Sequence, residues 1–134
     1  MTTTAPLGLN PSHWSRRLGF DQGRLVAAPT LVLTIAAQGP LDALGRLVHD
    51  DDPAAQLALT LANVAGVLAE AGMAWRDVVQ LRVYTTDLPA LLDVYDTLVE
   101  HLDEEGARPP ATIVEVSRLL VPGMTVSIDG LALH

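Results

Sequence analysis

Four side chains in the last forty or so positions of the chain have the chemistry to move protons. Glu115 and Asp129 are carboxylates, and a carboxylate held in an apolar wall is a good candidate for a general base. The Ser127 hydroxyl could orient water, and the Tyr95 hydroxyl could donate a hydrogen bond to a carbonyl oxygen or an imine nitrogen. These residue types favour acid–base catalysis on a small molecule.

Each of the four also has a structural interpretation, which the sequence leaves open. Tyr95 falls on the apolar stripe of a predicted helix, and Ser127 could be a small strand residue. Glu115 and Asp129 could be structural carboxylates that accept from a backbone amide, or that pair with Arg82 or Arg118.

Two predicted strands near the C-terminus must position these groups. Residues 111–117 are rich in β-formers, and Val121-Pro122-Gly123 predicts a turn before a second strand. In the first strand, the two-residue period puts four residues on one face: Ala111, Ile113, Glu115 and Ser117. The same period puts Ser127 and Asp129 on one face of the second strand.

Two helices are predicted upstream. The acidic run before Pro53 is a strong helix start, and the helix ends near Gly72. Its apolar stripe repeats at intervals of three and four: Leu57, Leu61, Val64 and Leu68. Asp87 predicts the cap of a second helix that ends before Gly106. The stripe of this helix is Leu91, Val94, Tyr95, Leu98 and Leu102.

Further strands are predicted at residues 24–28, 30–35 and 78–85, and residues 1–11 read as a flexible tail. The order β-β-α-β-α-β-β predicts a single α+β domain over residues 1–134, with two helices on one face of a mixed sheet. Several strands are apolar on both faces. We therefore expect other subunits to cover the second face, with the pocket between them.

Composition excludes several classes of function. The net charge of −8, with 16 acidic and 8 basic residues, argues against a nucleic-acid partner. The chain has no Cys, and all of its basic residues are Arg, so neither a thiolate nor a lysine Schiff base is available. No leader or membrane-spanning run is evident, so a cytoplasmic protein without a membrane partner is expected. His49 and the three Asp residues after it read as a solvated helix start, so neither metal nor cofactor is expected.

Four motifs stand in a fixed order along the chain: Trp75-Arg76-Asp77-Val78 after the first helix, Val83-Tyr84-Thr85-Thr86-Asp87-Leu88, Val114-Glu115-Val116 followed by Arg118-Leu119, and Val126-Ser127-Ile128-Asp129. This ordered set, from about Gly19 to Leu133, resembles the Rid (YjgF-type) family of enamine and imine deaminases. The resemblance implies the chorismate-mutase-like α+β fold of that family. It also implies a homotrimer with its sheets inward and three clefts at the subunit interfaces.

The resemblance further implies a site that this sequence has changed. In the family an arginine binds the substrate carboxylate and a glutamate positions water or moves protons. Here the arginine position falls on Ala111, the cysteine position on Ile113, the glutamate position on Ser127, the asparagine position on Tyr95 and the tyrosine position on Phe20. Gln38, ahead of Gly39 and Pro40, keeps its expected place.

Without the arginine, a 2-imino acid would enter with its carboxylate unpaired. Arg108 could replace it, or could be an exposed residue before the rigid Pro-Pro turn. The cleft that the resemblance implies would have a wall of Ala111, Ile113 and Ser127, with Tyr95 and Phe20 nearby. Such a pocket, which would orient its substrate partly through backbone groups near Gln38 and Gly39, suits a neutral, bulkier small molecule. The sequence thus favours a cofactor-free enzyme for imine or enamine hydrolysis, tautomerisation or cyclisation, as in specialised biosynthesis. The alternative is a catalytically silent small-molecule-binding or interaction protein on the same trimeric scaffold.

Overall fold

A mixed sheet of four strands, in the order β3-β6-β4-β5, forms the centre of the computed structural model, which describes residues 5–134. The strands are β3 (Val32–Gln38), β4 (Val78–Thr85), β5 (Ala111–Glu115) and β6 (Val126–Leu133). β4 and β5 are parallel, whereas β6 is antiparallel to both β3 and β4. The predicted α+β class and mixed sheet are confirmed.

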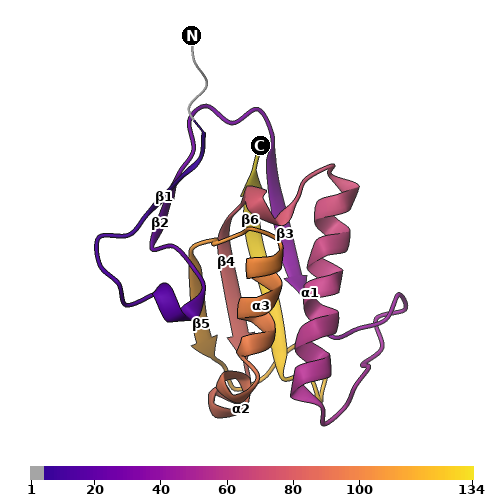
Figure 1. The fold of residues 1–134 in the computed structure, drawn as a ribbon. Coiled ribbons are helices and arrows are strands. Elements are labelled where there is room, and N and C mark those ends of the chain that lie inside the picture. Colours follow the sequence, from indigo (N-terminus) through magenta and orange to yellow (C-terminus); the bar gives the residue numbers. More distant parts are fainter. Residues whose placement is uncertain (1–4) are drawn as a thin grey trace.

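Three helices cover one face of this sheet (Figure 1). α1 (Pro53–Glu70) begins where the Asp52 side chain accepts a hydrogen bond from the Ala55 amide at 3.1 Å. The predicted second helix is in fact two, α2 (Leu88–Asp93) and α3 (Asp96–Glu104). Val94 leaves helical geometry with φ −111° and ψ 11°, and this break makes Tyr95 the cap of α3. Two 3₁₀ turns, η1 (Arg16–Leu18) and η2 (Trp75–Asp77), complete the helical elements of the described residues.

The core lies between α1, α3 and the helix side of the sheet. The predicted stripe of α1 is confirmed, with exposed fractions of 2% or less: Leu57, Leu61, Val64 and Leu68. These side chains meet Val83 and Ile128 of the sheet, which are fully buried. Each such burial stabilises the fold by about 1.5–3 kcal/mol, so this face of the sheet is fixed by the α1 contact.

A separate two-stranded hairpin is formed by β1 (Leu7–Leu9) and β2 (Gly23–Leu25), with Gly8 opposite Arg24. The prediction of a flexible tail over residues 1–11 is therefore wrong for residues 7–9, because β2 supplies their partner. The first predicted strand is also shorter than residues 24–28. It ends at Leu25, and Ala28 takes a left-handed φ of 42°, which bends the chain toward β3.

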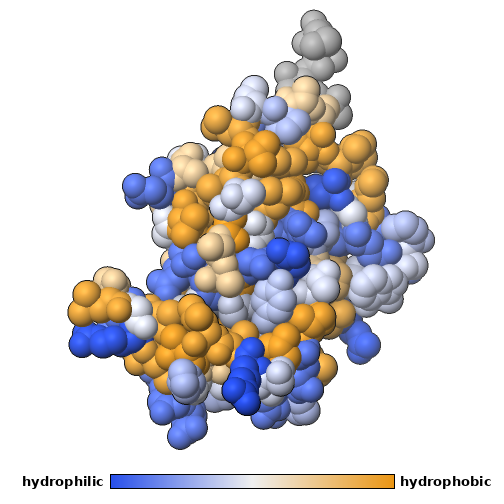
Figure 2. Space-filling view, turned by 180° about the vertical axis from the view of Figure 1, so that it is seen from behind, coloured by the Kyte–Doolittle hydropathy of each residue, from blue (hydrophilic) through white to orange (hydrophobic). Residues whose placement is uncertain are grey.

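The second face of the sheet is open in the single chain. Alternate residues point to it, including exposed Val32 and half-buried Leu131 and Leu133. Figure 2 shows hydrophobic residues in an upper and a lower region of this side of the molecule, with hydrophilic residues between them. Apolar residues on a sheet face without a covering layer are the feature from which an oligomer was expected.

Candidate functional site

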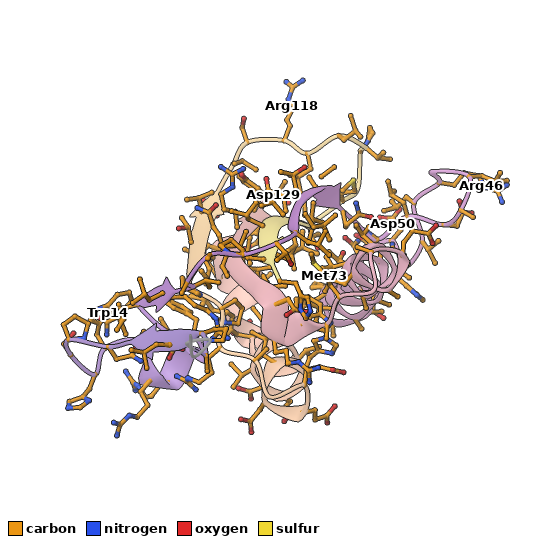
Figure 3. All side chains as sticks on the ribbon, turned by 90° about the horizontal axis from the view of Figure 1, so that it is seen from above. Trp14, Arg46, Asp50, Met73, Arg118 and Asp129 are labelled. Atoms are coloured by element: carbon orange, nitrogen blue, oxygen red, sulfur yellow. The ribbon has the colours of Figure 1, made fainter. Side chains whose placement is uncertain are left out.

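Three polar side chains lie together on the open face of the sheet. Arg82 donates from Nε to Asp129 Oδ1 at 2.7 Å, and the Tyr84 hydroxyl donates to Asp129 Oδ2 at 3.1 Å. The Asp129 side chain is 15% exposed, while that of Arg82 is 52% exposed. Figure 3 shows Asp129 on the side of the sheet away from α3. β4 and β6 position this open-face triad, which is Arg82, Tyr84 and Asp129, because Arg82 is the register partner of Asp129.

Two members of the open-face triad, Tyr84 and Arg82, have raised pKa values. Desolvation raises the pKa of the Tyr84 phenol above its ordinary value, and the Asp129 carboxylate beside it adds to that effect. The hydrogen bond to Asp129, followed by its charge, likewise raises the pKa of the Arg82 guanidinium. Tyr84 is therefore a protonated donor at neutral pH, and Asp129 is an acceptor whose two oxygens are both engaged.

Ser127 lies on the same open face as the triad, since its register partner in β4 is Tyr84. Its exposed fraction is only 4%. Ala111 and Ile113 lie on the opposite, helix-covered face, because they pair with Leu81 and Val83 of β4. The expected wall of Ala111, Ile113 and Ser127 is thus not formed within one chain. The two-residue period of each strand was predicted correctly. The register of the strands, however, places Ala111 and Ile113 on one face of the sheet and Ser127 on the other.

Tyr95 and Phe20 are both buried, and Tyr95 belongs to the core on the helix side of the sheet. Phe20 is 5% exposed and Tyr95 is 6% exposed. The Tyr95 hydroxyl donates to the backbone carbonyl oxygen of Leu18 at 2.7 Å, and burial raises its pKa to about 12. Trp14 packs edge-to-face against Phe20, with ring centroids 5.7 Å apart. The hydroxyl predicted to meet a substrate therefore anchors η1 to α3 instead.

Glu115 and Asp129 follow the structural interpretation that the sequence left open. Glu115 is exposed, and its Oε1 accepts from the backbone amide of Leu88 at 2.9 Å, at the start of α2. Asp129 pairs with Arg82, as described above. Both carboxylates thus have hydrogen-bond partners within the chain.

Arg108 does not reach the position of Ala111 in the single chain. Its Nε lies 3.3 Å from Oδ1 of Asp21, and its backbone oxygen accepts from the Asp21 amide at 3.0 Å. Asn10 Nδ2 also donates to Asp21, at 2.8 Å. Arg108 therefore fastens the segment after η1 to the start of β5, in line with the structural interpretation.

Gln38 and Gly39 lie at the end of β3, beside a cavity of about 560 Å³ that Leu59 and Asn63 of α1 also line. Gln38 Nε2 donates to the Ala36 carbonyl at 3.0 Å, and Asn63 Nδ2 donates to the Gly39 carbonyl at 2.8 Å. This cavity does not include Tyr95, Ser127 or any residue of β5. The structure does not gather the predicted site residues into one pocket within a single chain.

Sequence reasoning missed Tyr84 as a site residue, although it named Arg82 as a partner for a carboxylate. The signal was present, since residues 82 and 84 share a face by the strand period. Among residues 5–134, no group of three His, Cys, Asp or Glu side chains is placed to hold a metal ion. No helix in that part of the chain is long and apolar enough to cross a membrane.

One family model matches most of the chain. The model described as Endoribonuclease L-PSP covers residues 23–134. A search among curated proteins finds no match.

Solved structures agree with that assignment. YyfB from Yersinia pestis, a protein of unknown function of the conserved Rid family, is 28% identical, with a TM-score of 0.88 over 98% of this chain and 100% of that chain. The YjgF gene product of E. coli is 27% identical, with a TM-score of 0.68 over 85% and 87% of the two chains. E. coli TdcF, solved with bound serine, is 24% identical, with a TM-score of 0.70 over 86% and 87%, and shows the fold alone.

Proposed function

We propose, starting from the fact that this chain belongs to the Endoribonuclease L-PSP (Rid/YjgF) family, that it binds a small, mostly neutral molecule in clefts between its own copies. In this proposal the protein is a homotrimer that does not deaminate amino-acid-derived imines by the arginine-dependent route. The observation that carries it is that the predicted acid–base groups are already engaged within the fold.

The engaged groups are those that a catalyst would need free. The Tyr95 hydroxyl donates to Leu18, and Glu115 accepts from the Leu88 amide. To use the Tyr95 hydroxyl, a substrate would have to break its hydrogen bond and leave the part-buried Leu18 carbonyl unpaired, at a cost of about 1–3 kcal/mol. The Glu115 bond is exposed, so breaking it costs less. Binding requires no such exchange, so the geometry favours a binding protein over a catalyst.

The two faces of the sheet support the proposed location of the cleft between subunits. Ala111 and Ile113 belong to the helix side, at the edge strand β5, while Ser127 belongs to the open face. Groups on opposite faces of one sheet cannot line a common cleft within one chain. They can do so in an oligomer, where the open face of one subunit lies against the β5 edge of the next. The exposed apolar residues at the rim of the open face, such as Val32 with 64% exposure, support association of this kind.

The preference for a neutral ligand rests on Ala111 and Ile113. A carboxylate bound beside them would lose its hydration and find no guanidinium, whereas a neutral group loses less. Ribonuclease activity, which the family description names, is not part of the proposal. A net charge of −8 repels a phosphate backbone.

A second candidate function, acid–base catalysis, is favoured by the open-face triad. Tyr84 is a protonated donor beside a carboxylate, and Ser127 lies next to it in register. Such a pair could protonate an imine nitrogen or orient water if a subunit interface enclosed it. If the protein turns over an imine, loss of that turnover in Tyr84→Phe, with binding of the imine retained, would identify this function.

The ligand preference can be tested with two molecules that differ only in charge, 2-oxobutanoate and 2-oxobutanamide. Isothermal titration calorimetry is expected to show that the native protein binds the amide at least as tightly as the carboxylate. Ala111→Arg should shift the preference toward the carboxylate by about tenfold or more, because it adds a charge-assisted hydrogen bond.

Ala62→Arg is the matched control, since Ala62 is exposed on α1 and the substitution adds the same charge. It should leave the preference unchanged. A native protein that binds the carboxylate more tightly than the amide would overturn the proposal, as would an equal response of the two variants.

A further inference from the structure

A second concave site, apart from the residues described above, lies between the hairpin and the end of β6. It is a cavity of about 480 Å³. Its walls come from the hairpin, from the segment that joins β2 to β3, from η2 and from the last residues of the chain. In Figure 1 the hairpin and the C-terminal end of β6 flank this region. No predicted site residue lines it.

Two arginines in this cavity have unused hydrogen-bond donors. The Arg24 side chain is 15% exposed, and its buried Nε has no hydrogen-bond partner among the described residues. Its Nη2 donates to the Arg76 carbonyl at 3.1 Å, while Nη1 lies 4.0 Å from Asp21. The Arg76 side chain is exposed, and within residues 5–134 its guanidinium has no hydrogen-bond partner. A buried guanidinium donor without an acceptor is costly, so an added acceptor would be stabilising.

The neighbouring acceptors are already used. Asp77 accepts from the Ala74 amide at 2.8 Å and lies 3.2 Å from the His134 ring. Asp21 accepts from Asn10, as described above, and pairs with Arg108. Asp77 lines the cavity but is bonded to Ala74 and His134, and Asp21 lies 4.0 Å from Nη1 of Arg24. The Nε of Arg24 and the guanidinium of Arg76 therefore remain as donors without an acceptor among the described residues.

The rest of the lining is mostly aliphatic. Its apolar members are Pro6, Val26, Ala27, Ala28, Pro29 and Leu133, and Thr30, Asp77 and His134 are the polar residues beside the two arginines. A wall of this kind suits a ligand with a short hydrocarbon body, and the volume exceeds what a chain of six carbons needs. Inorganic anions would use only the arginines and would leave the apolar wall in water.

We propose that this cavity binds a small organic anion with an aliphatic body, its carboxylate meeting Arg24 and Arg76 and its chain lying along Val26 and Leu133. This cavity would thus bind an anion through its arginines, whereas the proposed cleft at Ala111 has no arginine and would bind a neutral ligand. The two sites are built from different residues, so either can be present without the other.

The test uses hexanoate and its neutral analogue hexanamide, titrated into isotopically labelled protein and followed by amide chemical shifts. Hexanoate is expected to saturate, with shifts at Val26, Thr30 and Leu133, and hexanamide to bind about tenfold or more weakly. Arg76→Gln should weaken hexanoate by a similar factor and leave hexanamide unchanged, since it removes only the charge-assisted bond. Arg24→Gln should do the same, with circular dichroism confirming its fold.

Arg118→Gln is the control, because Arg118 extends away from the body of the molecule on the loop between β5 and β6 (Figure 3). It should bind hexanoate like the native protein. Equal affinities for hexanoate and hexanamide would overturn the proposal, as would equal losses in Arg76→Gln and Arg118→Gln. Shifts confined to Phe20 and Ala111 would also overturn it, since they would place the anion in the cleft predicted to prefer neutral ligands.

Discussion

Replacing Tyr95 with Phe tests whether its hydroxyl is a structural group or one free for a substrate. The change removes one oxygen atom from a side chain that is 6% exposed. It leaves the Leu18 carbonyl, now bonded at 2.7 Å, without its donor. A part-buried acceptor left unpaired costs about 1–3 kcal/mol, so the melting temperature should fall by about 4–12 °C for a chain of this size.

The same variant should change the stability of the protein at high pH. Burial raises the pKa of Tyr95 from 10.0 to about 12 in the folded state, whereas in the unfolded chain it titrates near 10.0. Its contribution is thus fully present below pH 10 and is lost as the pH rises through about 12. Over that window the native protein should lose up to about 2 kcal/mol more stability than Tyr95→Phe.

Urea unfolding followed by circular dichroism, at several pH values from neutral to alkaline, measures both effects. Tyr84→Phe is the matched control, because its hydroxyl lies on the open face and bonds a carboxylate that keeps Arg82 as a partner. It should cost about 1 kcal/mol or less at neutral pH. Equal stability of Tyr95→Phe and the native protein would refute the structural role, since the hydroxyl would then be free to meet a ligand.

Three further predictions follow from the described contacts. Asp129→Asn should lower the pKa of Tyr84 toward its ordinary value without restoring it fully, because burial is the larger cause of the shift. An ultraviolet titration of the tyrosines measures this change, and an unchanged pKa would contradict the contact between Tyr84 and Asp129. Asp52→Ala should cost about 1 kcal/mol by removing the cap of α1, and an unaltered urea midpoint would contradict that cap. Val32→Asp should dissociate the proposed trimer, as measured by light scattering, because it would bury an unpaired charge at the interface. Leu92→Asp, the same kind of change at an exposed α2 residue, should leave the trimer intact. A trimer that survives Val32→Asp would exclude the open face as its interface.

The fold was largely predictable because its local signals are strong. The α1 stripe and the caps at Asp52 and Asp87 are carried by residues close in sequence, and the structure has both caps. The break at Val94 was not predictable, since the apolar stripe runs through it without a glycine or proline. β1 was missed because three residues form a strand only when a distant partner, here β2, is present.

The candidate site was less predictable for a physical reason. The period of two tells which residues of one strand share a face, but not how that strand is registered against its neighbour. Ser127 and Ala111 are therefore on opposite faces, although each strand was interpreted correctly by itself. Hydrogen-bond partners such as Leu18 for Tyr95 lie far away in sequence, and only the folded chain shows that the candidate hydroxyl is occupied.

Ala111, which the resemblance places at the position of the family's arginine, is proposed to remove the usual deaminase reaction. The most direct measurement incubates the protein with freshly generated 2-aminoacrylate and follows pyruvate formation. The native protein is expected to match the rate in buffer alone. Pyruvate formation well above that rate and proportional to protein concentration would show that the reaction does not need an arginine at position 111.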